Sequence, residues 1–258
     1  MIEYDQETAR KIESNYITPE IAHQRIRTLE GLALRPGEYV LDAGCGTGFL
    51  TREIAIAVGP NGRVVGIDSS LDMLDLATMR CKGLPQVQLK KGTVEELPEK
   101  GNSFDAVSCV QVLLYVPEVA KALGELHRVL KRGGRCIILE TDWRGVVLNS
   151  PDEGLSRRMF AAWNDAVPSP KLPVQLGPLL RTQGFTAIRV EPIPILNTSY
   201  RLDNFSVDTL KWVAHYAQEQ GAVTEEEAAT WLADLCRLGE KGEFFFCVNR
   251  FLFSAVKL

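Results

Sequence analysis

From residue 39 to residue 140 the sequence alternates between short apolar stretches and amphipathic stretches. The apolar stretches are typical of buried β-strands, and most of the segments between them carry apolar residues at helical spacing. Strands that alternate with helices form βαβ units, which build a parallel sheet. We therefore predict an α/β fold with a doubly wound, mostly parallel sheet. The expected strands are 39–42, 63–67, 87–90, 104–109 and 135–140, with helices over 49–58, 70–81 and 119–130.

The pattern is less regular outside this region. A proline-rich linker is predicted at residues 168–173. The run 244–253 reads as a buried strand, in which Asn249 and Arg250 would need polar partners. The other predicted helices cover 18–34, 151–167, 175–183, 206–220 and 224–238, and the other extended segments cover 187–196 and 243–257.

Composition excludes several classes of protein. The chain has 258 residues and a net charge of −4, and it shows no basic stripe, which argues against a nucleic-acid partner. No apolar run is long enough for membrane insertion, and the polar start lacks an apolar signal core. Six scattered cysteines without a CxxC motif and three distant histidines predict reduced thiols and no metal site. We expect a single-domain, cytoplasmic protein.

The segment Val40-Leu-Asp-Ala-Gly-Cys-Gly-Thr-Gly48 connects the first of these strands to a helix. Its glycines allow a sharp turn and a close approach of the backbone to a ligand. A dinucleotide fingerprint is absent because Phe49 stands where its third glycine belongs, and no P-loop Gly-Lys-Ser/Thr follows. Asp68, 20 residues after Gly48, ends the next strand and can accept ribose hydroxyls. The pattern predicts a nucleoside-containing cofactor.

This turn and four later motifs resemble the class I S-adenosylmethionine-dependent methyltransferases, in particular the group with the ubiquinone and menaquinone C-methyltransferases. The later motifs are Val65-Gly-Ile-Asp-Ser-Ser70, Gly92-Thr-Val-Glu-Glu-Leu-Pro98, Phe104-Asp-Ala-Val107 and Arg128-Val-Leu-Lys-Arg-Gly-Gly134. The resemblance covers residues 20–140. It implies a Rossmann-like, seven-stranded sheet with an antiparallel edge strand supplied by 244–256, the cofactor S-adenosyl-L-methionine, and the product S-adenosyl-L-homocysteine.

The resemblance also implies which residues meet the cofactor. They are Gly44, Cys45 and Gly46 at the methionine half, Asp68, Ser69 and Met73 around the ribose and adenine, Thr93, Val94 and Glu95 at the adenine edge, and Val110 and Gln111 beside the sulfonium. Packing alone also explains Cys45 and Met73. The family commonly carries Asp where Thr93 stands, so one contact to the adenine amine is absent or replaced by a hydroxyl.

Two residues are candidates for acid–base catalysis. Related small-molecule enzymes often carry His-His where this chain has Leu114 and Tyr115, which leaves Tyr115 as the titratable side chain of that pair. His215 lies between Trp212 and Tyr216 in a predicted helix. The alternative interpretations are a rim aromatic for Tyr115 and a surface histidine for His215. Methyl transfer from a sulfonium requires a base only when the acceptor must lose a proton.

We predict one domain over 1–258, with a cofactor-binding core at 35–142 and a helical substrate cover from 1–30, 143–173 and 197–242. The N-terminal part of this cover would form a lid through Tyr4, Tyr16, Gln24 and Arg27. Aromatic residues of the cover, including Trp143 and Trp163, favour an acceptor with apolar or planar parts.

The expected function is methyl transfer from S-adenosylmethionine to a small-molecule acceptor. Two alternatives remain open from the sequence. One is a methyltransferase that acts on tRNA or protein, and the other is a non-catalytic module that binds S-adenosylmethionine. The acceptor atom and the oligomeric state do not follow from the sequence.

Overall fold

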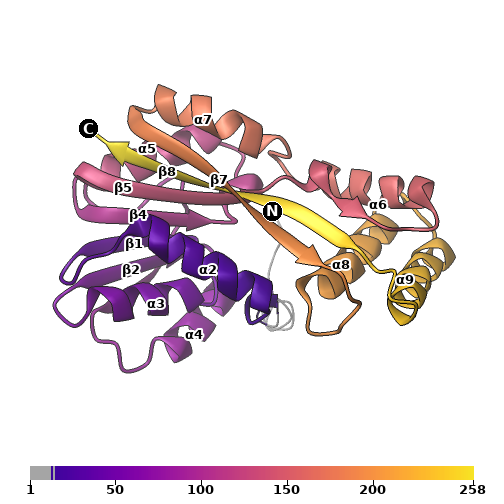
Figure 1. Cartoon of the computed structure of the whole chain (residues 1–258). Helices are drawn as coiled ribbons and strands as arrows, with labels where there is room; N and C mark the ends of the chain where they lie inside the picture. Colours follow the sequence, from indigo (N-terminus) through magenta and orange to yellow (C-terminus); the bar gives the residue numbers. More distant parts are fainter. Residues whose placement is uncertain (1–12, 14) are drawn as a thin grey trace.

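An eight-stranded sheet forms the centre of the computed structural model, which describes residue 13 and residues 15–258 (Figure 1). The strand order is β3-β2-β1-β4-β5-β8-β6, and β7 pairs with the other side of β8. The strands are β1 (Tyr39–Ala43), β2 (Arg63–Asp68), β3 (Val87–Lys91), β4 (Phe104–Val110), β5 (Leu130–Thr141), β6 (Val147–Leu148), β7 (Phe185–Asn197) and β8 (Phe246–Lys257). The predicted mixed α/β class is confirmed.

Two details of the predicted sheet are wrong. There are eight strands instead of seven, because the two residues of β6 pair with the start of β8. The last strand is antiparallel, as expected, but it lies between β5 and β7 and not at the edge. β7 takes the outer position and carries Pro192 and Pro194. Proline has no N–H to donate to a neighbouring strand, so an edge strand tolerates it.

Helices cover both faces of the sheet (Figure 1). Alternate strand residues point to opposite faces, so Val40 packs in a cluster with α2 and α3, whereas Leu41 packs in the cluster that contains α5 and α7. The helices are α2 (Pro19–Leu32), α3 (Phe49–Val58), α4 (Leu71–Arg80), α5 (Val119–Val129), α6 (Glu153–Asp165), α7 (Leu172–Thr182), α8 (Phe205–Glu219) and α9 (Glu225–Glu240). The predicted linker is shorter than expected, because α7 already includes Pro173 in its first turn, where proline is tolerated.

Three helices, α6, α8 and α9, pack together beyond the carboxyl ends of the parallel strands (Figure 1). Helix α9 begins at a capping box, in which the Thr224 and Glu227 side chains each bond to the other's backbone N–H. Trp231 of α9 is almost fully buried and donates a hydrogen bond to the hydroxyl of Ser156. The buried residues of this helical cover belong to the same apolar cluster as those under α5. The cover therefore shares a continuous core with the sheet.

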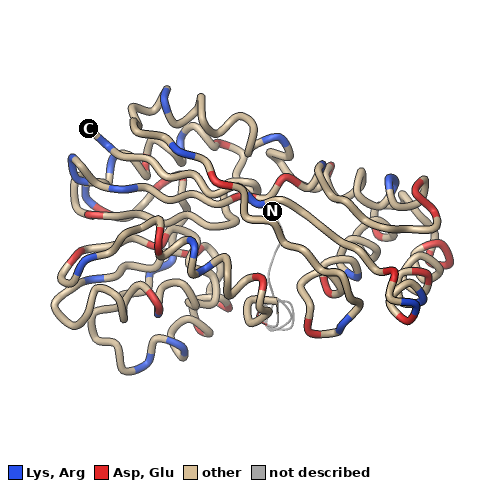
Figure 2. The backbone as a smooth tube through the Cα atoms, viewed as in Figure 1, with Lys and Arg blue, Asp and Glu red and all other residues tan. Residues whose placement is uncertain are grey.

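Charged residues are distributed over the outer helices and loops. In the view of Figure 2, Lys and Arg alternate with Asp and Glu, and no continuous basic track runs across that side. Within residues 13 and 15–258, none of the helices combines the length and the apolar character that a membrane span requires.

Candidate functional site

The glycine-rich turn between β1 and α3 is built almost entirely from backbone. Gly44, Gly46 and Gly48 have φ of 76°, 50° and 80°, a region that side chains with a Cβ adopt rarely. A Cβ at position 44 would lie 2.1 Å from Cγ2 of Val112. The N–H groups of Gly44 and Cys45 both donate to the carbonyl of Ile67, at 2.7 and 2.9 Å. The turn is thus fastened to the end of β2.

Asp68, the last residue of β2, faces this turn. Its Oδ2 accepts a hydrogen bond from the N–H of Gly46 at 2.8 Å, and its Oδ1 accepts one from the N–H of Ser70 at 3.0 Å. Each carboxylate oxygen can accept a further bond. Burial raises the pKa of Asp68, although these backbone donors oppose the rise. The carboxylate is held in place and retains acceptor capacity for two hydroxyl groups of a ligand.

Asp42, at the other side of the turn, is satisfied within the protein. Its Oδ2 accepts from the hydroxyl of Thr51 at 2.6 Å, and its Oδ1 accepts from the hydroxyl of Ser108 at 2.8 Å. Burial raises the pKa of Asp42 to about 6, against the effect of both hydroxyls. The side chain ties β1 to α3 and β4. Its position beside the turn makes it a support for the site.

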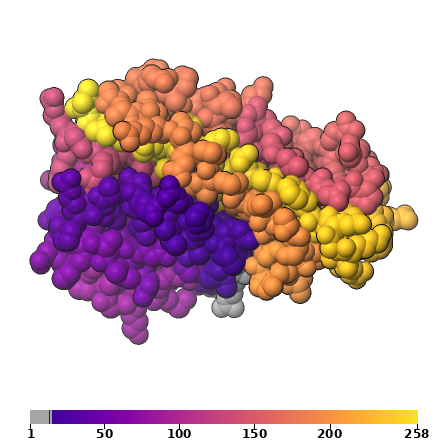
Figure 3. All heavy atoms as spheres, in the orientation of Figure 1, coloured from indigo at the N-terminus to yellow at the C-terminus, as the bar shows by residue number. Residues whose placement is uncertain are grey.

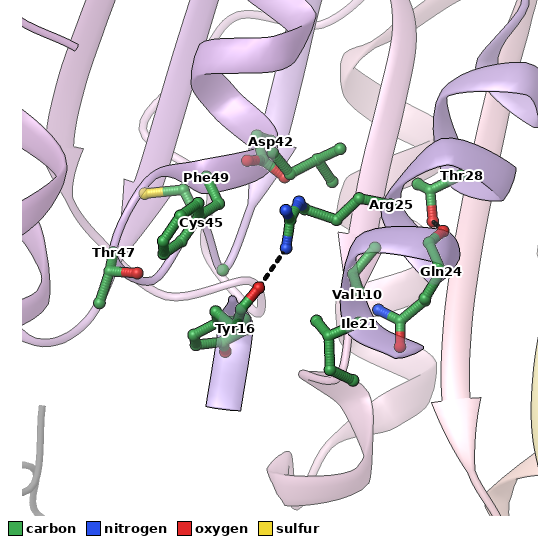
Figure 4. A pocket seen from close by; sticks show the side chains of 12 residues that line it. Tyr16, Ile21, Gln24, Arg25, Thr28, Asp42, Cys45, Thr47, Phe49 and Val110 are labelled. Atoms are coloured by element: carbon green, nitrogen blue, oxygen red, sulfur yellow. Dashed lines mark hydrogen bonds between the residues drawn. The ribbon is translucent and has the colours of Figure 1, made fainter. Parts of the chain in front are cut away.

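A pocket lies directly over the turn, and α2 covers it (Figure 4). Thr47, buried in this lining, has a hydroxyl without a hydrogen-bond partner, and such a group needs a ligand or a water. In Figure 4 the Arg25 side chain reaches from α2 toward Tyr16 and donates a hydrogen bond to the Tyr16 carbonyl. The pocket is lined by Tyr16, Ile21, Gln24, Arg25, Thr28, Asp42, Gly44, Cys45, Thr47, Phe49, Leu50 and Val110.

Phe49 contacts residues that cover the pocket and also residues around the glycine-rich turn that forms its floor. The guanidinium of Arg80 lies 3.5 Å from the centroid of the Phe49 ring, and that of Arg25 lies 5.0 Å from it. Arg80 donates to the carbonyl of Thr47 and pairs with Glu13, while Tyr16 packs its ring against Phe49. Figure 3 shows α2, in indigo, lying against the orange residues of β7. Helix α2, which covers the pocket, therefore also contacts the C-terminal half of the chain.

Three of the eleven predicted cofactor residues line the pocket, and Asp68 is not among them. Gly44, Cys45 and Val110 line the pocket, and the N–H of Gly46 bonds to Asp68. Burial raises the pKa of the Cys45 thiol strongly, which disfavours the thiolate and is consistent with the packing interpretation. Among the other predicted residues, Met73 and Val94 are buried, Glu95 is half-buried, and Ser69 and Thr93 are exposed.

Gln111 follows β4 in a left-handed conformation, with φ of 57°. Its Nε2 donates to the carbonyl of Leu139 at 3.2 Å, and its Oε1 accepts from the hydroxyl of Thr141 at 2.7 Å. Both amide atoms therefore bond to β5. In the structure this residue joins the carboxyl ends of β4 and β5, beside the pocket-lining Val110.

Two of the four predicted lid residues, Tyr16 and Gln24, line the pocket. Arg27 instead pairs with Glu30 and Glu191 on the outside of α2. Tyr4 lies outside the described residues. Arg25, which the sequence analysis did not single out, takes the position toward the pocket because α2 turns it to the same side as Ile21 and Thr28.

The two candidate catalytic residues lie in different environments. Tyr115 is half-buried in a short 3-10 helix (Leu113–Tyr115) that follows β4. Its side chain is close enough to Arg250 that a Tyr115 phenolate would favour the charged state of the guanidinium. His215 is exposed on α8 and lies 3.3 Å from the carboxylate of Glu219, one turn along the same helix. It is not among the residues that line the pocket. Neither residue lines the pocket: Tyr115 is half-buried close to Arg250, and His215 is exposed on the surface.

Two charged residues near the same edge were missed as site candidates. Glu140 is fully buried, and its Oε1 accepts from the N–H groups of Val112 and Leu113 at 3.1 and 2.7 Å. Burial raises its pKa to about 8. It ends an apolar strand, the same signal that identified Asp68. Arg250 is also buried, and the sequence feature that could have identified it is a charged residue within an aromatic run.

The chain is similar to several known proteins. Residues 34–169, just over half of the chain, match the family described as Methyltransferase domain. A 37.1 kDa protein of transposon TN4556 from Streptomyces fradiae is 39% identical over 166 residues, which cover 64% of this chain and 48% of that protein. Demethylmenaquinone methyltransferase of Staphylococcus aureus (strain JH9) is 42% identical over 117 residues, covering 45% of this chain and 48% of the relative.

The match therefore spans about half the length of these curated relatives. Among solved structures, the fold is similar to phosphoethanolamine N-methyltransferase 2 of Haemonchus contortus in complex with S-adenosyl-L-methionine. The TM-score is 0.66 at 19% identity, and the match covers 98% of this chain and 57% of that one. At this identity the likeness concerns the fold alone.

Proposed function

This chain belongs to the methyltransferase domain family, and we propose that it transfers the methyl group of S-adenosylmethionine to a small-molecule acceptor and releases S-adenosylhomocysteine. One observation carries the proposal. The Asp68 carboxylate accepts a hydrogen bond from the Gly46 N–H across the glycine-rich turn, and each of its oxygens can accept a further bond. This is the arrangement that a nucleoside with two free ribose hydroxyls requires. The matched residues, 34–169, contain both the turn and Asp68.

S-adenosylmethionine is the cofactor, and the residues present fit it. Asp68 would hold the ribose, and the turn from Gly44 to Gly46 would lie along the methionine half, with no side chain between backbone and ligand. The hydroxyl of Thr47, buried in the pocket and without a partner, supplies a further polar contact. When bound, the cofactor supplies a methyl group already activated by a positive sulfur.

The protein's own contribution is alignment and exclusion of water. Holding two reactants in line removes much of the entropic cost of a bimolecular step. The rigid turn, fastened to β2 through Asp68 and the carbonyl of Ile67, provides a fixed floor for this alignment. Tyr16 and Arg25, which cover the pocket, would limit the access of bulk water to the reacting groups. No side chain has to form a covalent intermediate.

Several observations support a small acceptor. The pocket lies under α2, so a bulky macromolecule would have to displace that helix to reach the turn. The net charge is −4, and a tRNA substrate would be favoured by a basic surface. The 42% identical relative is named a demethylmenaquinone methyltransferase, and a quinone is neither a nucleic acid nor a protein. Trp143, Trp163 and Tyr216 form a chain of edge-to-face ring contacts in the cover, which suits apolar or planar acceptors.

The proposal is tested by methyl transfer from S-adenosylmethionine labelled in its methyl group. The acceptors offered in parallel are a panel of reduced quinones and phenols, total tRNA, and a mixture of unfolded proteins. We expect label in the organic-soluble products and release of S-adenosylhomocysteine. Label in tRNA or protein would support the macromolecular alternative. Cofactor binding without transfer to any of the three would support the non-catalytic module.

A further inference from the structure

Arg250 is a buried cation that forms no ion pair within 4 Å among the described residues, although the buried carboxyl of Glu140 is near enough to favour its charged state. It lies in β8 with 5% of its surface exposed, and its guanidinium is 4.8 Å from the centroid of the Phe205 ring. One guanidinium nitrogen donates a hydrogen bond to Oε1 of Gln24, and Nε has no partner. A neutral amide and an aromatic face offset only part of the cost of burying a charge. An anion would complete the site.

The position of Arg250 is at the carboxyl edge of the sheet, next to the pocket. Arg250 is the register partner of Thr141, the last residue of β5. The Thr141 hydroxyl donates to Gln111 at 2.7 Å, directly after the pocket-lining Val110. Gln24, which bonds to Arg250, lines the pocket itself. Gln24 therefore lies in contact with both the pocket and the Arg250 guanidinium.

This place is on the acceptor side of the site. The sheet order β2-β1-β4-β5-β8 separates the strand of Asp68 from the strand of Arg250 by four spacings. At about 4.8 Å for each spacing, the two strands lie about 19 Å apart. Arg25, and not Arg250, is the arginine that lines the pocket beside Gly44 and Cys45. Arg250 therefore lies beyond β4, away from the residues that would hold the cofactor.

Tyr16 links the two sides. Its hydroxyl lies 3.8 Å from the place that a Cβ of Gly46 would occupy, so it stands over the turn. Burial raises the pKa of the Tyr16 phenol, and the nearby charge of Arg250 acts in the opposite direction. Tyr16 is therefore close both to Arg250 and to the space above the glycine-rich turn, where acceptor and methyl group would meet.

We propose that Arg250, presented by Gln24, anchors the methyl acceptor by pairing with an anionic oxygen of that molecule, either a carboxylate or a phenolate. The inference rests on the proposed function, because it assigns the acceptor subsite of the same active centre. A buried guanidinium pairs with an oxyanion through short, charge-assisted hydrogen bonds. Selectivity for an anionic acceptor follows, since a neutral analogue leaves the buried cation unpaired.

The test compares anionic and neutral probes on the full chain saturated with S-adenosylhomocysteine. The carboxylate pair is 2-naphthoate and 2-naphthamide, and the phenolate pair is 4-nitrophenolate and 4-nitroanisole at a pH where the nitrophenol is ionised. Titration calorimetry gives each dissociation constant for the wild type, Arg250→Gln, Gln24→Glu and the control Arg27→Gln. Arg27 is an arginine on the outer side of α2, paired with Glu191.

In the wild type and in Arg27→Gln we expect the anionic member of at least one pair to bind about tenfold more tightly than its neutral partner. The pair that shows the preference identifies the kind of oxyanion. Arg250→Gln should lose the preference. Gln24→Glu is isosteric and gives Arg250 an internal carboxylate, so it should keep the fold and also lose the preference. In Arg250→Gln the affinity for S-adenosylhomocysteine should stay within about twofold of the wild type, because Arg250 does not line the cofactor pocket.

Three results would overturn the assignment. The wild type could show no preference with either pair, or Gln24→Glu could retain the wild-type preference, which would make the Arg250–Gln24 contact purely structural. Alternatively, Arg250→Gln could fold and lose affinity for S-adenosylhomocysteine, which would place Arg250 at the cofactor. Failure of the wild type to bind S-adenosylhomocysteine is a separate outcome, because it contradicts the proposed function before any acceptor is added.

Discussion

At the scale of single residues, carboxylates at strand ends organise this molecule. Asp42, Asp68 and Glu140 each lie at or near the carboxyl end of a parallel strand, and each accepts hydrogen bonds from the turn that follows or from a neighbouring element. An apolar strand that ends in a carboxylate could be recognised in the sequence, because a buried acid needs donors. What each acid does could not be predicted, since the donors come from residues distant in sequence, such as Ser108 for Asp42.

Asp68 is the residue whose loss should affect cofactor binding most specifically. Asp68→Ala removes the acceptor for ribose hydroxyls and leaves the Gly46 N–H without its partner. We expect binding of S-adenosylhomocysteine to weaken by about 1–3 kcal/mol. Calorimetric titration measures this directly, with Asp75→Ala as the control, since Asp75 is exposed on the adjacent helix α4. Equal affinity of the Asp68→Ala variant and the wild type would refute the ribose assignment.

Glu140 should make stability depend on pH. Its pKa is raised from 4.5 to about 8 by burial, so between these values the folded state holds a proton that the unfolded state has lost. Stability from this group is therefore lost as pH rises through the window, at a limiting slope of about 1.4 kcal/mol per pH unit. Glu140→Gln mimics the protonated form and should gain stability relative to the wild type from pH 5 to pH 8.

Urea unfolding of both proteins at several pH values measures that difference. Below about pH 3.5 the difference should become constant, because the carboxyl is then almost fully protonated in both states. A difference that stays constant across the whole range would mean that Glu140 titrates as an ordinary exposed acid, contrary to its burial.

At the scale of elements, most helices and strands agree with the sequence within a few residues, because their signals are local. Apolar periodicity and caps such as Thr224 lie inside the element that they define. The sheet order carried no comparable signal. The pairing of β7 with β8 joins Phe185 to Lys257, and only packing between distant segments selects it. This is why the last strand was expected at the edge and is found inside.

The glycine-rich turn is the element with the least tolerance. Gly44→Ala places a Cβ 2.1 Å from Cγ2 of Val112 at a φ of +76°, so both sterics and backbone oppose it. Gly37→Ala is the matched control, because Gly37 has a φ of +85° with no atom within 4 Å of its Cβ position. We expect a loss of about 1 kcal/mol for Gly37→Ala from backbone strain alone.

For Gly44→Ala the overpacking adds to this strain, and the loss should be at least about 2 kcal/mol. Chemical denaturation of the two variants compares them. Equal losses would show that Val112 yields without cost and that the turn is less tightly packed than its geometry indicates.

The stability of the helical cover should depend on the N-terminal cap of α9, its last helix. Thr224→Ala removes the hydroxyl that accepts from the Glu227 N–H and should cost about 1 kcal/mol of stability. Thr224→Ser retains the hydroxyl and should cost little. Thermal unfolding of the two variants distinguishes them. Because α9 shares its core with the sheet, we expect one cooperative transition, and a separate early transition for the cover would contradict that shared core.

At the scale of the whole molecule, the cofactor half is far more recognisable from sequence than the acceptor half. The turn and Asp68 lie within 25 residues of one another, so a motif can contain them. The inferred acceptor subsite joins Gln24 to Arg250, which are 226 residues apart and meet only when α2 folds over β8. Tyr115 lies near that subsite, whereas His215, chosen for its chemistry, lies on the surface. Proteins that share a fold can combine one kind of cofactor site with different acceptors, which explains why the cofactor half is more recognisable than the acceptor half.

The most direct test of the central claim is a calorimetric titration of the purified chain with S-adenosylhomocysteine, with NAD as the control ligand. We predict saturable binding of S-adenosylhomocysteine in the micromolar range and no binding of NAD, because the turn has Phe49 where a dinucleotide site needs glycine. Absence of S-adenosylhomocysteine binding, or equal binding of NAD, would contradict the claim that the glycine-rich turn and Asp68 form a methyltransferase cofactor site.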